Sequence, residues 1–300
     1  MDRIIITGAT GFVGINITDY LKSKALYLVE GLSLRKPVGY LLKARAVIHL
    51  AGKAHDLKNA GDPGEYFDIN TTLTKKLFEL FLKSEVSDFI YFSSVKAVAD
   101  EVAGILQEDV IPDPQTAYGK SKQQAEAYIM SQVLPEGKRV FILRPCMIHG
   151  PGNKGNLNLL YKLVKKGIPY PLAAFSNLRS FLSISNLNYI IERIISDPSI
   201  PGGIYNVADD IPLSTNEVIN IIATAGGYKT KLWKIRPPLI KSLAGMGDLL
   251  RLPLNSERLK KLTESYVVSN EKIRKALGIE ALPTSSRDGL VTTIKSFAQN

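Results

Sequence analysis

The chain has 300 residues, 45% of them hydrophobic, and a formal net charge of +10 at pH 7. Its single cysteine, Cys146, excludes an internal disulfide. The chain has neither an uncharged apolar run of about 18 residues nor a signal-like start, so we expect a soluble cytoplasmic protein without a membrane span. The Lys and Arg residues form no patch interleaved with aromatic residues, which argues against a nucleic-acid partner, whereas a phosphorylated substrate, an anionic membrane surface or a ligand-free basic surface would each suit the charge.

The N-terminal segment predicts a dinucleotide-binding turn. Residues 3–7 (RIIIT) are a β-branched run typical of a buried strand, and residues 15–24 follow a helical pattern. Between them lies G-x-x-G-x-x-G, in which Gly8 permits a tight turn, Gly11 lets the backbone approach a pyrophosphate and Gly14 lets helix and strand pack closely. Because a helix N-terminus offers free N–H groups to phosphate, a turn without a ligand is the less favoured alternative.

The second predicted strand, at 27–34, bears on the choice of cofactor. NAD-binding proteins usually carry a carboxylate near the end of this strand. Glu30 lies too early, and the strand is followed by Arg35 and Lys36, whose charges would suit the 2′-phosphate of NADP. A solvated charged turn explains these two residues equally well, so NAD and NADP both stay open.

Strands and helices alternate through the first half of the chain, which is typical of a doubly wound parallel sheet. The other elements predicted in this half are strands at 46–51, 89–92 and 140–144 and helices at 71–84 and 117–132. We predict an α/β fold with a Rossmann-like dinucleotide-binding domain over residues 1–152.

The pattern changes after Gly152. The second half shows helical patterns at 156–166, 186–196, 215–225, 271–277 and 288–299, short strands at 179–184 and 203–207, and a stretch at 229–258 that is basic and apolar by turns. Ser214 and Glu217 predict a capping box. We predict that residues 153–300 form mainly a smaller substrate-binding region, from which some segments return to the first domain.

Two short patterns predict catalytic chemistry. Ser94 follows the strand at 89–92, at the carboxyl end where open parallel sheets bind ligands, although capping a turn is a common role for serine. Tyr118 and Lys122 are four residues apart and lie on one face of the helix at 117–132. The Lys122 ammonium is expected to lower the Tyr118 pKa from about 10 towards neutrality and so to make the phenol a general acid and base, although an ordinary surface helix can show the same pair.

Six motifs, in order along the chain, resemble those of the extended short-chain dehydrogenase/reductase superfamily, in its NAD-dependent epimerase/dehydratase branch. They are T-G-A-T-G-F-V-G at 7–14, V-I-H-L-A-G at 47–52, N-x-x-x-T at 70–74, S-S at 93–94, Y-x-x-x-K at 118–122 and R-P-x-x-x-x-G-P-G at 144–152. The resemblance implies that Tyr118 moves the proton of a sugar hydroxyl or ketone, that Lys122 holds the ribose, and that Ser94 orients the substrate oxygen. The nicotinamide would carry the hydride.

The resemblance also extends to the ligand contacts. The cofactor-binding residues expected are Gly8, Thr10, Gly11, Phe12, Val13, Gly14, Arg35, Leu50, Ala51, Gly52, Asn70, Tyr118, Lys122 and Pro145. Asn156 and Arg179 are implied to contact the diphosphate of a nucleotide sugar, and Arg258 is a weaker candidate for which a surface role is favoured. A homodimer is implied, and no metal site is predicted.

The sequence departs from the family pattern in three places. The third strand of the dinucleotide-binding domain is shortened or missing, since only 32 residues separate Gly14 from Val47. His149 replaces the usual Tyr of a Y-G-P motif, and the usual R-D-F-x-H-V-D is R-S-F-L-S-I-S at 179–185. These changes leave the three catalytic candidates intact.

The expected activity is NAD(P)-dependent oxidoreduction at C4 of a nucleotide-linked hexose or N-acetylhexosamine. A UDP-hexose or UDP-N-acetylhexosamine 4-epimerase is placed slightly ahead of an NADPH-dependent 4-keto-sugar reductase of surface-polysaccharide synthesis, which Arg35 and Lys36 favour. A non-catalytic cofactor-binding scaffold is the alternative from another class, and the intact Ser94, Tyr118 and Lys122 set argues against it.

Overall fold

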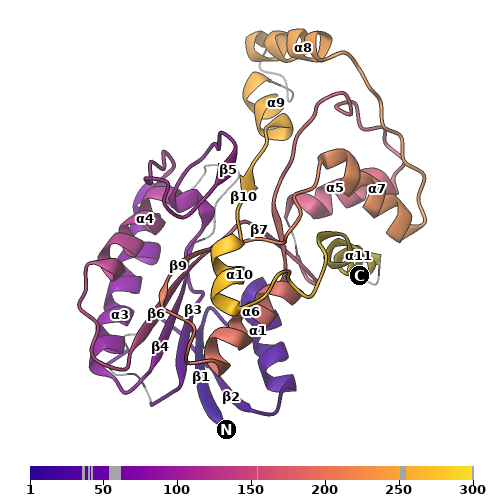
Figure 1. Cartoon of the computed structure of the whole chain (residues 1–300). Helices are drawn as coiled ribbons and strands as arrows, with labels where there is room; N and C mark the ends of the chain where they lie inside the picture. Colours follow the sequence, from indigo (N-terminus) through magenta and orange to yellow (C-terminus); the bar gives the residue numbers. More distant parts are fainter. Residues whose placement is uncertain are drawn as a thin grey trace.

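The computed structural model describes residues 1–35, 38–39, 41, 43–53, 62–153, 155–250 and 255–298. Its centre is a sheet made of β1 (Asp2–Thr7), β2 (Tyr27–Leu32), β3 (Ala46–His49), β4 (Asp88–Phe92), β6 (Arg139–Pro145) and β9 (Gly203–Val207). All neighbouring pairs are parallel, and the spatial order is β2-β1-β3-β4-β6-β9 (Figure 1). The predicted Rossmann-like α/β fold is therefore confirmed.

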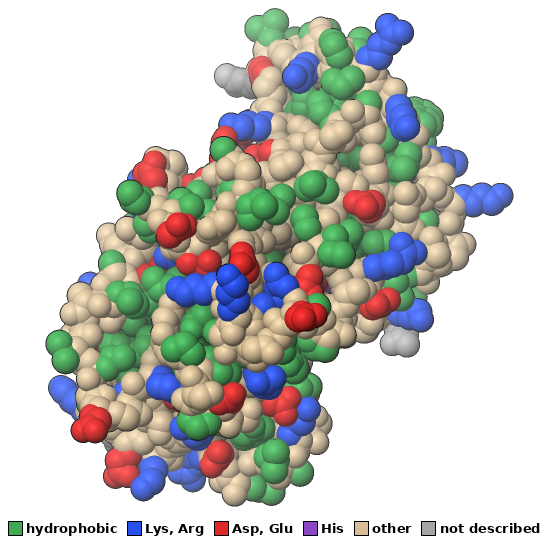
Figure 2. Space-filling model, viewed as in Figure 1, with side chains coloured by type: hydrophobic (Ala, Val, Ile, Leu, Met, Phe, Trp, Pro, Cys, Tyr) green, Lys and Arg blue, Asp and Glu red, His purple; other side chains and the backbone are tan. Residues whose placement is uncertain are grey.

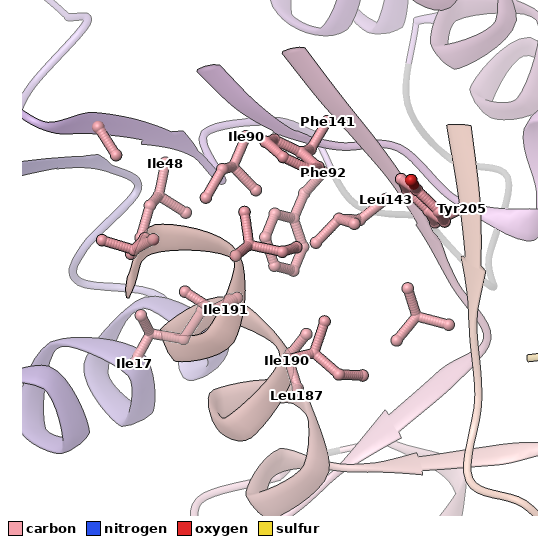
Figure 3. Packing of buried hydrophobic residues seen from close by; sticks show 14 of the residues in the cluster. Ile17, Ile48, Ile90, Phe92, Phe141, Leu143, Leu187, Ile190, Ile191 and Tyr205 are labelled. Atoms are coloured by element: carbon pink, nitrogen blue, oxygen red, sulfur yellow. The ribbon is translucent and has the colours of Figure 1, made fainter. Parts of the chain in front are cut away.

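Helices cover both faces of this sheet, which is why its strands are apolar on both sides. One face packs against α1 (Phe12–Ser23), α6 (Ile184–Ser196) and α10 (Glu271–Leu277), and the other against α3 (Leu73–Lys83) and α4 (Ala117–Met130). Figure 3 shows Ile17 of α1 and Ile191 of α6 close to Ile48 and Ile90 of the sheet. Burial of each such side chain contributes about 1.5–3 kcal/mol, so the two faces hold the sheet rigid beneath its carboxyl edge.

The sheet is short on the side of β2. Strand β1 pairs with β2 on one side and with β3 on the other, and in the described ranges no strand lies beyond β2. The chain passes from β2 to β3 through residues 33–45. The described residues therefore agree with the prediction that the family's usual third strand is shortened or missing.

The second half of the chain builds a separate core. Its helices are α5 (Asn156–Lys165), α7 (Thr215–Gly226), α8 (Pro237–Leu250), α9 (Ser256–Thr263) and α11 (Ser286–Ala298). The predicted capping box opens α7, because Ser214 Oγ accepts a hydrogen bond from Glu217 N at 3.1 Å and the Glu217 carboxylate accepts one from Ser214 N at 2.7 Å. Helices α8 and α9 were not predicted. None of the described helices combines the length and apolar character needed to cross a bilayer.

Two small parallel pairs connect the halves. They are β7 (Met147–His149) with β8 (Phe181–Ser183), and β5 (Ile105–Leu106) with β10 (Val267–Val268). Strand β9 joins the main sheet, and α6 and α10 pack on it, so segments of the second half do return to the first core. The domain boundary at residue 152 stays a prediction.

The helix predicted at 71–84 begins earlier than expected. It starts as α2 (Pro63–Tyr66), where the Asp62 side chain accepts a hydrogen bond from Gly64 N, and continues as a π-helical turn, η1 (Phe67–Thr72), before it becomes α3. Wide π-helical turns are frequent at functional sites. This one contains Asn70, which the resemblance places near the cofactor.

Candidate active site

The glycine-rich turn between β1 and α1 is shaped by close backbone contacts. Gly8 has a φ of +70°, and a Cβ there would lie 2.8 Å from the Ala51 nitrogen. A Cβ at Gly14 would lie 2.2 Å from the Gly8 oxygen. No side chain fits at either position, because the neighbouring atoms are backbone and cannot move aside.

Gly11 has a different role in this turn. It caps α1 with extended backbone and without a side-chain hydrogen bond, and a Cβ there would meet only the Gly8 oxygen, at 3.4 Å. The N-terminal N–H groups of α1 therefore face open space beside an exposed glycine, and this cradle fits a pyrophosphate. Of the other predicted contacts on this loop, Thr10 is exposed and Phe12 and Val13 are half-buried.

Two alanine substitutions separate these roles. Gly14→Ala is expected to destabilise the fold by about 1–3 kcal/mol or more, since it overpacks a rigid backbone contact. Gly11→Ala is expected to leave the melting temperature nearly unchanged and to weaken NADH binding by tenfold or more, because its methyl group occupies the cradle. Thermal melts and NADH fluorescence titrations check both, and tight NADH binding by Gly11→Ala would contradict the assignment of this cradle.

A buried hydrogen-bond relay positions the loop that follows β3. His49 Nδ1 lies 2.7 Å from Thr7 Oγ1, and its Nε2 lies 2.8 Å from Thr74 Oγ1. Thr7 Oγ1 also accepts a hydrogen bond from Ala51 N at 3.1 Å. Burial, and secondarily the Lys122 charge, lower the His49 pKa to about 3, so the His49 side chain is neutral. Its role is to position the loop by hydrogen bonding and not to transfer protons. The sequence analysis did not single out His49, although it lies in the V-I-H-L-A-G motif.

Asn70 ties this loop to α4. Its Oδ1 accepts a hydrogen bond from Lys53 N at 2.8 Å, and its Nδ2 donates to Lys53 O at 3.1 Å and to Ser121 Oγ at 3.0 Å. A Cβ at Gly52 would lie 2.9 Å from Asn70 Oδ1 and 3.3 Å from Lys122 Nζ. Asn70 therefore holds the loop against α4, and its predicted contact with the cofactor stays a prediction.

Ser94, Tyr118 and Lys122 meet at the carboxyl edge of the sheet. Ser94 follows β4 and caps a 3-10 turn, η2 (Val95–Ala97), by accepting a hydrogen bond from Lys96 N at 3.2 Å, and its hydroxyl is also hydrogen-bonded to that of Tyr118. Ser94 therefore takes the capping role considered for it, and its hydroxyl also contacts Tyr118. Lys122 is 5% exposed, and its Nζ donates to Phe92 O at 2.8 Å and lies 4.9 Å from the centre of the Tyr91 ring.

Gly119 brings α4 close enough for this contact. A Cβ at Gly119 would lie 2.4 Å from the Lys96 oxygen, so the first turn of α4 can lie on the η2 turn only because no side chain intervenes. Thr116 caps α4 by accepting a hydrogen bond from Gly119 N at 3.2 Å. The sequence analysis missed Gly119, whose only signal is its place within Y-G-K-S-K.

The predicted fall in the Tyr118 pKa is wrong for this structure. Loss of solvation raises the Tyr118 pKa above its usual value of 10.0, and the hydrogen bond from Ser94 offsets this only in part. The reason is that the Lys122 ammonium is directed at the Phe92 carbonyl and the Tyr91 ring. Burial also lowers the pKa of Lys122 itself, to about 8. At pH 7 the phenol therefore carries its proton.

The Lys122 pKa leads to a prediction about stability. The folded-state pKa of about 8 lies below that of an unfolded lysine, about 10.4, so between these values the unfolded chain binds more protons. Stability therefore rises with pH across this window, by up to roughly 3 kcal/mol, and the cost of the buried charge is fully present below pH 8. Urea unfolding of the wild-type protein and of Lys122→Met from pH 7 upwards checks this, and a constant difference between the two would contradict it.

The predicted substrate residues lie in the second half. Asn156 is exposed at the start of α5, and Arg258 is exposed near the start of α9. Arg179 is half-buried, donates from Nε to Glu264 O at 3.3 Å and from Nη2 to Lys261 O, and so contacts the end of α9. A diphosphate at Arg179 would compete with these carbonyl groups, and contact of all three residues with a substrate stays a prediction.

The remaining predicted residues are placed as follows. Pro145 is buried at the end of β6, and Leu50 and Ala51 are half-buried beside Gly8. Arg35 is exposed just beyond β2, whereas Lys36 lies outside the described residues. His149 is buried, with Nδ1 2.9 Å from Thr293 Oγ1, so this departure from the family pattern is a packing feature of β7 and α11.

Comparison with known proteins gives consistent results. The model of the NAD dependent epimerase/dehydratase family matches residues 4–208. The chain is 29% identical to the UDP-glucose 4-epimerase of Vibrio cholerae, over 99% of this chain and 95% of that protein. It is 28% identical to the GDP-6-deoxy-D-mannose reductase of Pseudomonas aeruginosa, over 74% of this chain and 79% of that one. The structure of MoeE5 with UDP-glucose and NAD shares the fold, with a TM-score of 0.75, 20% identity and 99% of each chain covered. The structure of RMD from Pseudomonas aeruginosa with NADPH also shares it.

Proposed function

Because the chain belongs to the NAD-dependent epimerase/dehydratase family, we propose that it is a nucleotide-sugar 4-epimerase that acts on a UDP-hexose or UDP-N-acetylhexosamine. It is an enzyme of the short-chain dehydrogenase/reductase type that uses NAD or NADP. The preference for the epimerase rests on the similarity to the UDP-glucose 4-epimerase, which extends over nearly the whole chain. The homodimer and the cytoplasmic location remain part of this proposal.

One structural observation supports the cofactor site. The loop at Ala51 and Gly52 contacts the glycine-rich turn at Gly8 and the ammonium of Lys122, so this loop connects the proposed phosphate site with the proposed catalytic residues. A dinucleotide bound to the α1 N-terminus would extend along this loop towards Tyr118. The residues present therefore fit a nicotinamide dinucleotide.

The chain's own residues account for the proton transfers. When bound, the cofactor would supply the acceptor and donor of the hydride at C4. Once the Tyr118 phenol has released its own proton to solvent, its oxygen would take the proton of the sugar 4-hydroxyl and return it after the sugar has turned. The Ser94 hydroxyl, which is hydrogen-bonded to Tyr118, has a single proton and would donate it to the reacting oxygen once substrate is bound. Lys122, whose pKa of about 8 keeps it charged at pH 7, would hold the ribose of the cofactor.

A 4-keto-sugar reductase is the second candidate, and a specific observation favours it. The Tyr118 phenol holds its proton at pH 7, which is the state that donates to a keto oxygen. Arg35 is exposed beyond the end of β2, where it could meet a 2′-phosphate. The similarity to the GDP-6-deoxy-D-mannose reductase is consistent with this alternative.

The test begins with the cofactor. Mass spectrometry of small molecules released from freshly purified, denatured protein identifies any retained dinucleotide, and fluorescence titration compares NADH with NADPH. Retained NAD, followed by conversion of UDP-glucose or UDP-N-acetylglucosamine to its C4 epimer in NMR assays without added cofactor, supports the epimerase. An empty site that prefers NADPH supports the reductase, and binding of neither dinucleotide would overturn both proposals.

A further inference from the structure

Helix α8 exposes an apolar stripe that the fold leaves uncovered. Leu239, Leu243, Met246 and Leu250 are 56%, 46%, 54% and 60% exposed. Their spacing of four, three and four residues places them on one side of the helix. The neighbouring side, about 100° further around the helix, carries Ile240, Ala244 and Gly247, which are buried. Ile240 and Ala244 pack in the second core. Helix α8 therefore has a broad apolar face, and only one part of that face packs against the protein.

The segment around this stripe is strongly basic. Residues 229–264 contain nine Lys or Arg and three Asp or Glu, so they carry a net charge of +6 out of the chain's +10. Exposed members of this set include Lys234 and Arg236 before α8, Lys241 within it, and Lys260 and Lys261 on α9. Figure 2 shows basic and apolar side chains together at the end of the molecule formed by α8 and α9, which projects from the body in Figure 1.

We propose that this end of the molecule docks on the surface of an anionic lipid bilayer, with the α8 stripe inserted among the headgroups and the basic residues facing the lipid phosphates. An amphipathic helix with a cationic border is the element that binds at such an interface. Trp233 is 56% exposed, lies four residues before α8, and is of the type that prefers the headgroup region.

The charge distribution favours a bilayer over a second copy of the chain. A symmetric contact through α8 would bring two segments of net charge +6 together, and like charges oppose such a contact. An anionic lipid surface offers the complementary charge. Apolar burial and electrostatic attraction then act in the same direction.

Docking would also orient the candidate active site. Helix α9 packs against α8, and its last residues accept hydrogen bonds from Arg179. On the proposed function, the diphosphate end of the substrate would then lie towards the lipid surface. Binding to lipid is tested without substrate, so a protein that does not bind vesicles would contradict the docking proposal and leave the proposed enzymatic function untouched.

The single tryptophan provides the first measurement. Trp233 is the only tryptophan of the chain, so intrinsic fluorescence reports on this end of the molecule alone. With vesicles of equimolar phosphatidylcholine and phosphatidylglycerol, we expect a blue shift of the emission and binding at least about tenfold tighter than to pure phosphatidylcholine. The shift is expected to weaken with added salt. Absence of a shift, together with no co-sedimentation of protein with the anionic vesicles, would overturn the proposal.

Matched variants separate the two contributions. Leu243→Glu with Met246→Glu is expected to weaken vesicle binding by about tenfold or more, whereas Leu159→Glu, on an α5 leucine that is 64% exposed, leaves it within about twofold. Lys234→Glu with Arg236→Glu is expected to weaken binding more than Lys22→Glu with Lys83→Glu, which alters net charge equally on α1 and α3. Equal effects of either variant and its control would contradict docking through α8. Sedimentation that shows a dimer lost only in the α8 variant, without vesicle binding by the wild type, would assign the stripe to a second copy.

Discussion

Replacing Tyr118 with Phe is expected to lower turnover of the nucleotide sugar by about 10²–10⁴-fold while the protein stays folded. The substitution removes only the hydroxyl, which is hydrogen-bonded to Ser94. The ring keeps its edge contact with Tyr66, at 6.1 Å between centroids. Initial rates of C4 epimerisation by NMR, or of keto-sugar reduction followed by NADPH absorbance, measure the loss, and NADH binding is expected to change little.

Tyr128→Phe is the matched control for this prediction. Tyr128 lies on the same helix, ten residues later, and its hydroxyl donates to the Glu79 carboxylate at 3.0 Å on the surface. The same atom is removed, so any general effect on α4 appears in both variants. Equal turnover of the two variants would remove Tyr118 from the chemistry and return attention to Lys122 and Ser94.

Replacing Glu126 with Ala is expected to destabilise the fold by roughly 3–5 kcal/mol. Glu126 and Arg144 are 3% and 2% exposed, and their side chains form a buried ion pair in which Arg144 Nη2 donates to Glu126 Oε2 at 2.6 Å. Arg144 Nε donates to both carboxylate oxygens at 3.1 Å. Removing the carboxylate leaves a guanidinium buried without its partner. Chemical unfolding followed by circular dichroism measures the loss.

Glu126 also acts on the pKa of Lys122. Its charge raises the Lys122 pKa against the larger effect of burial, so the substitution is expected to move that pKa below about 8. Binding of NADH should then weaken at a lower pH in the variant than in the wild type. An unchanged pH dependence would show that Glu126 has a structural role only.

Two further variants test the ion pair itself. Glu79→Ala removes an exposed carboxylate from α3 and is expected to cost no more than about 1 kcal/mol. The double variant Glu126→Met with Arg144→Met removes both charges and is expected to recover most of the lost stability, since a buried pair replaced by apolar residues is often neutral. A single substitution that costs no more than Glu79→Ala would contradict the buried-charge explanation.

The sequence alone was sufficient for the parts of the molecule that depend on local chemistry. The glycine spacing at 8–14 predicted the turn, because Gly8 and Gly14 lie so close to neighbouring backbone atoms that a Cβ at either position would clash. The strand β9 and the helix α10 have the predicted bounds, and the capping box of α7 was read directly from Ser214 and Glu217. Local hydrogen bonding and side-chain periodicity decide these features, and both are visible in a few neighbouring residues.

The tertiary structure decided what depends on the environment of a side chain. The four-residue spacing placed Tyr118 and Lys122 on one face, but burial and the Phe92 carbonyl determine their pKa values, and these reversed the predicted shift at Tyr118. The uncovered stripe of α8 emerged in the same way, because the residues at 229–258 show apolar and basic types without showing which side the core covers. Solvation and packing are properties of the assembled chain, so no short stretch of sequence contains them.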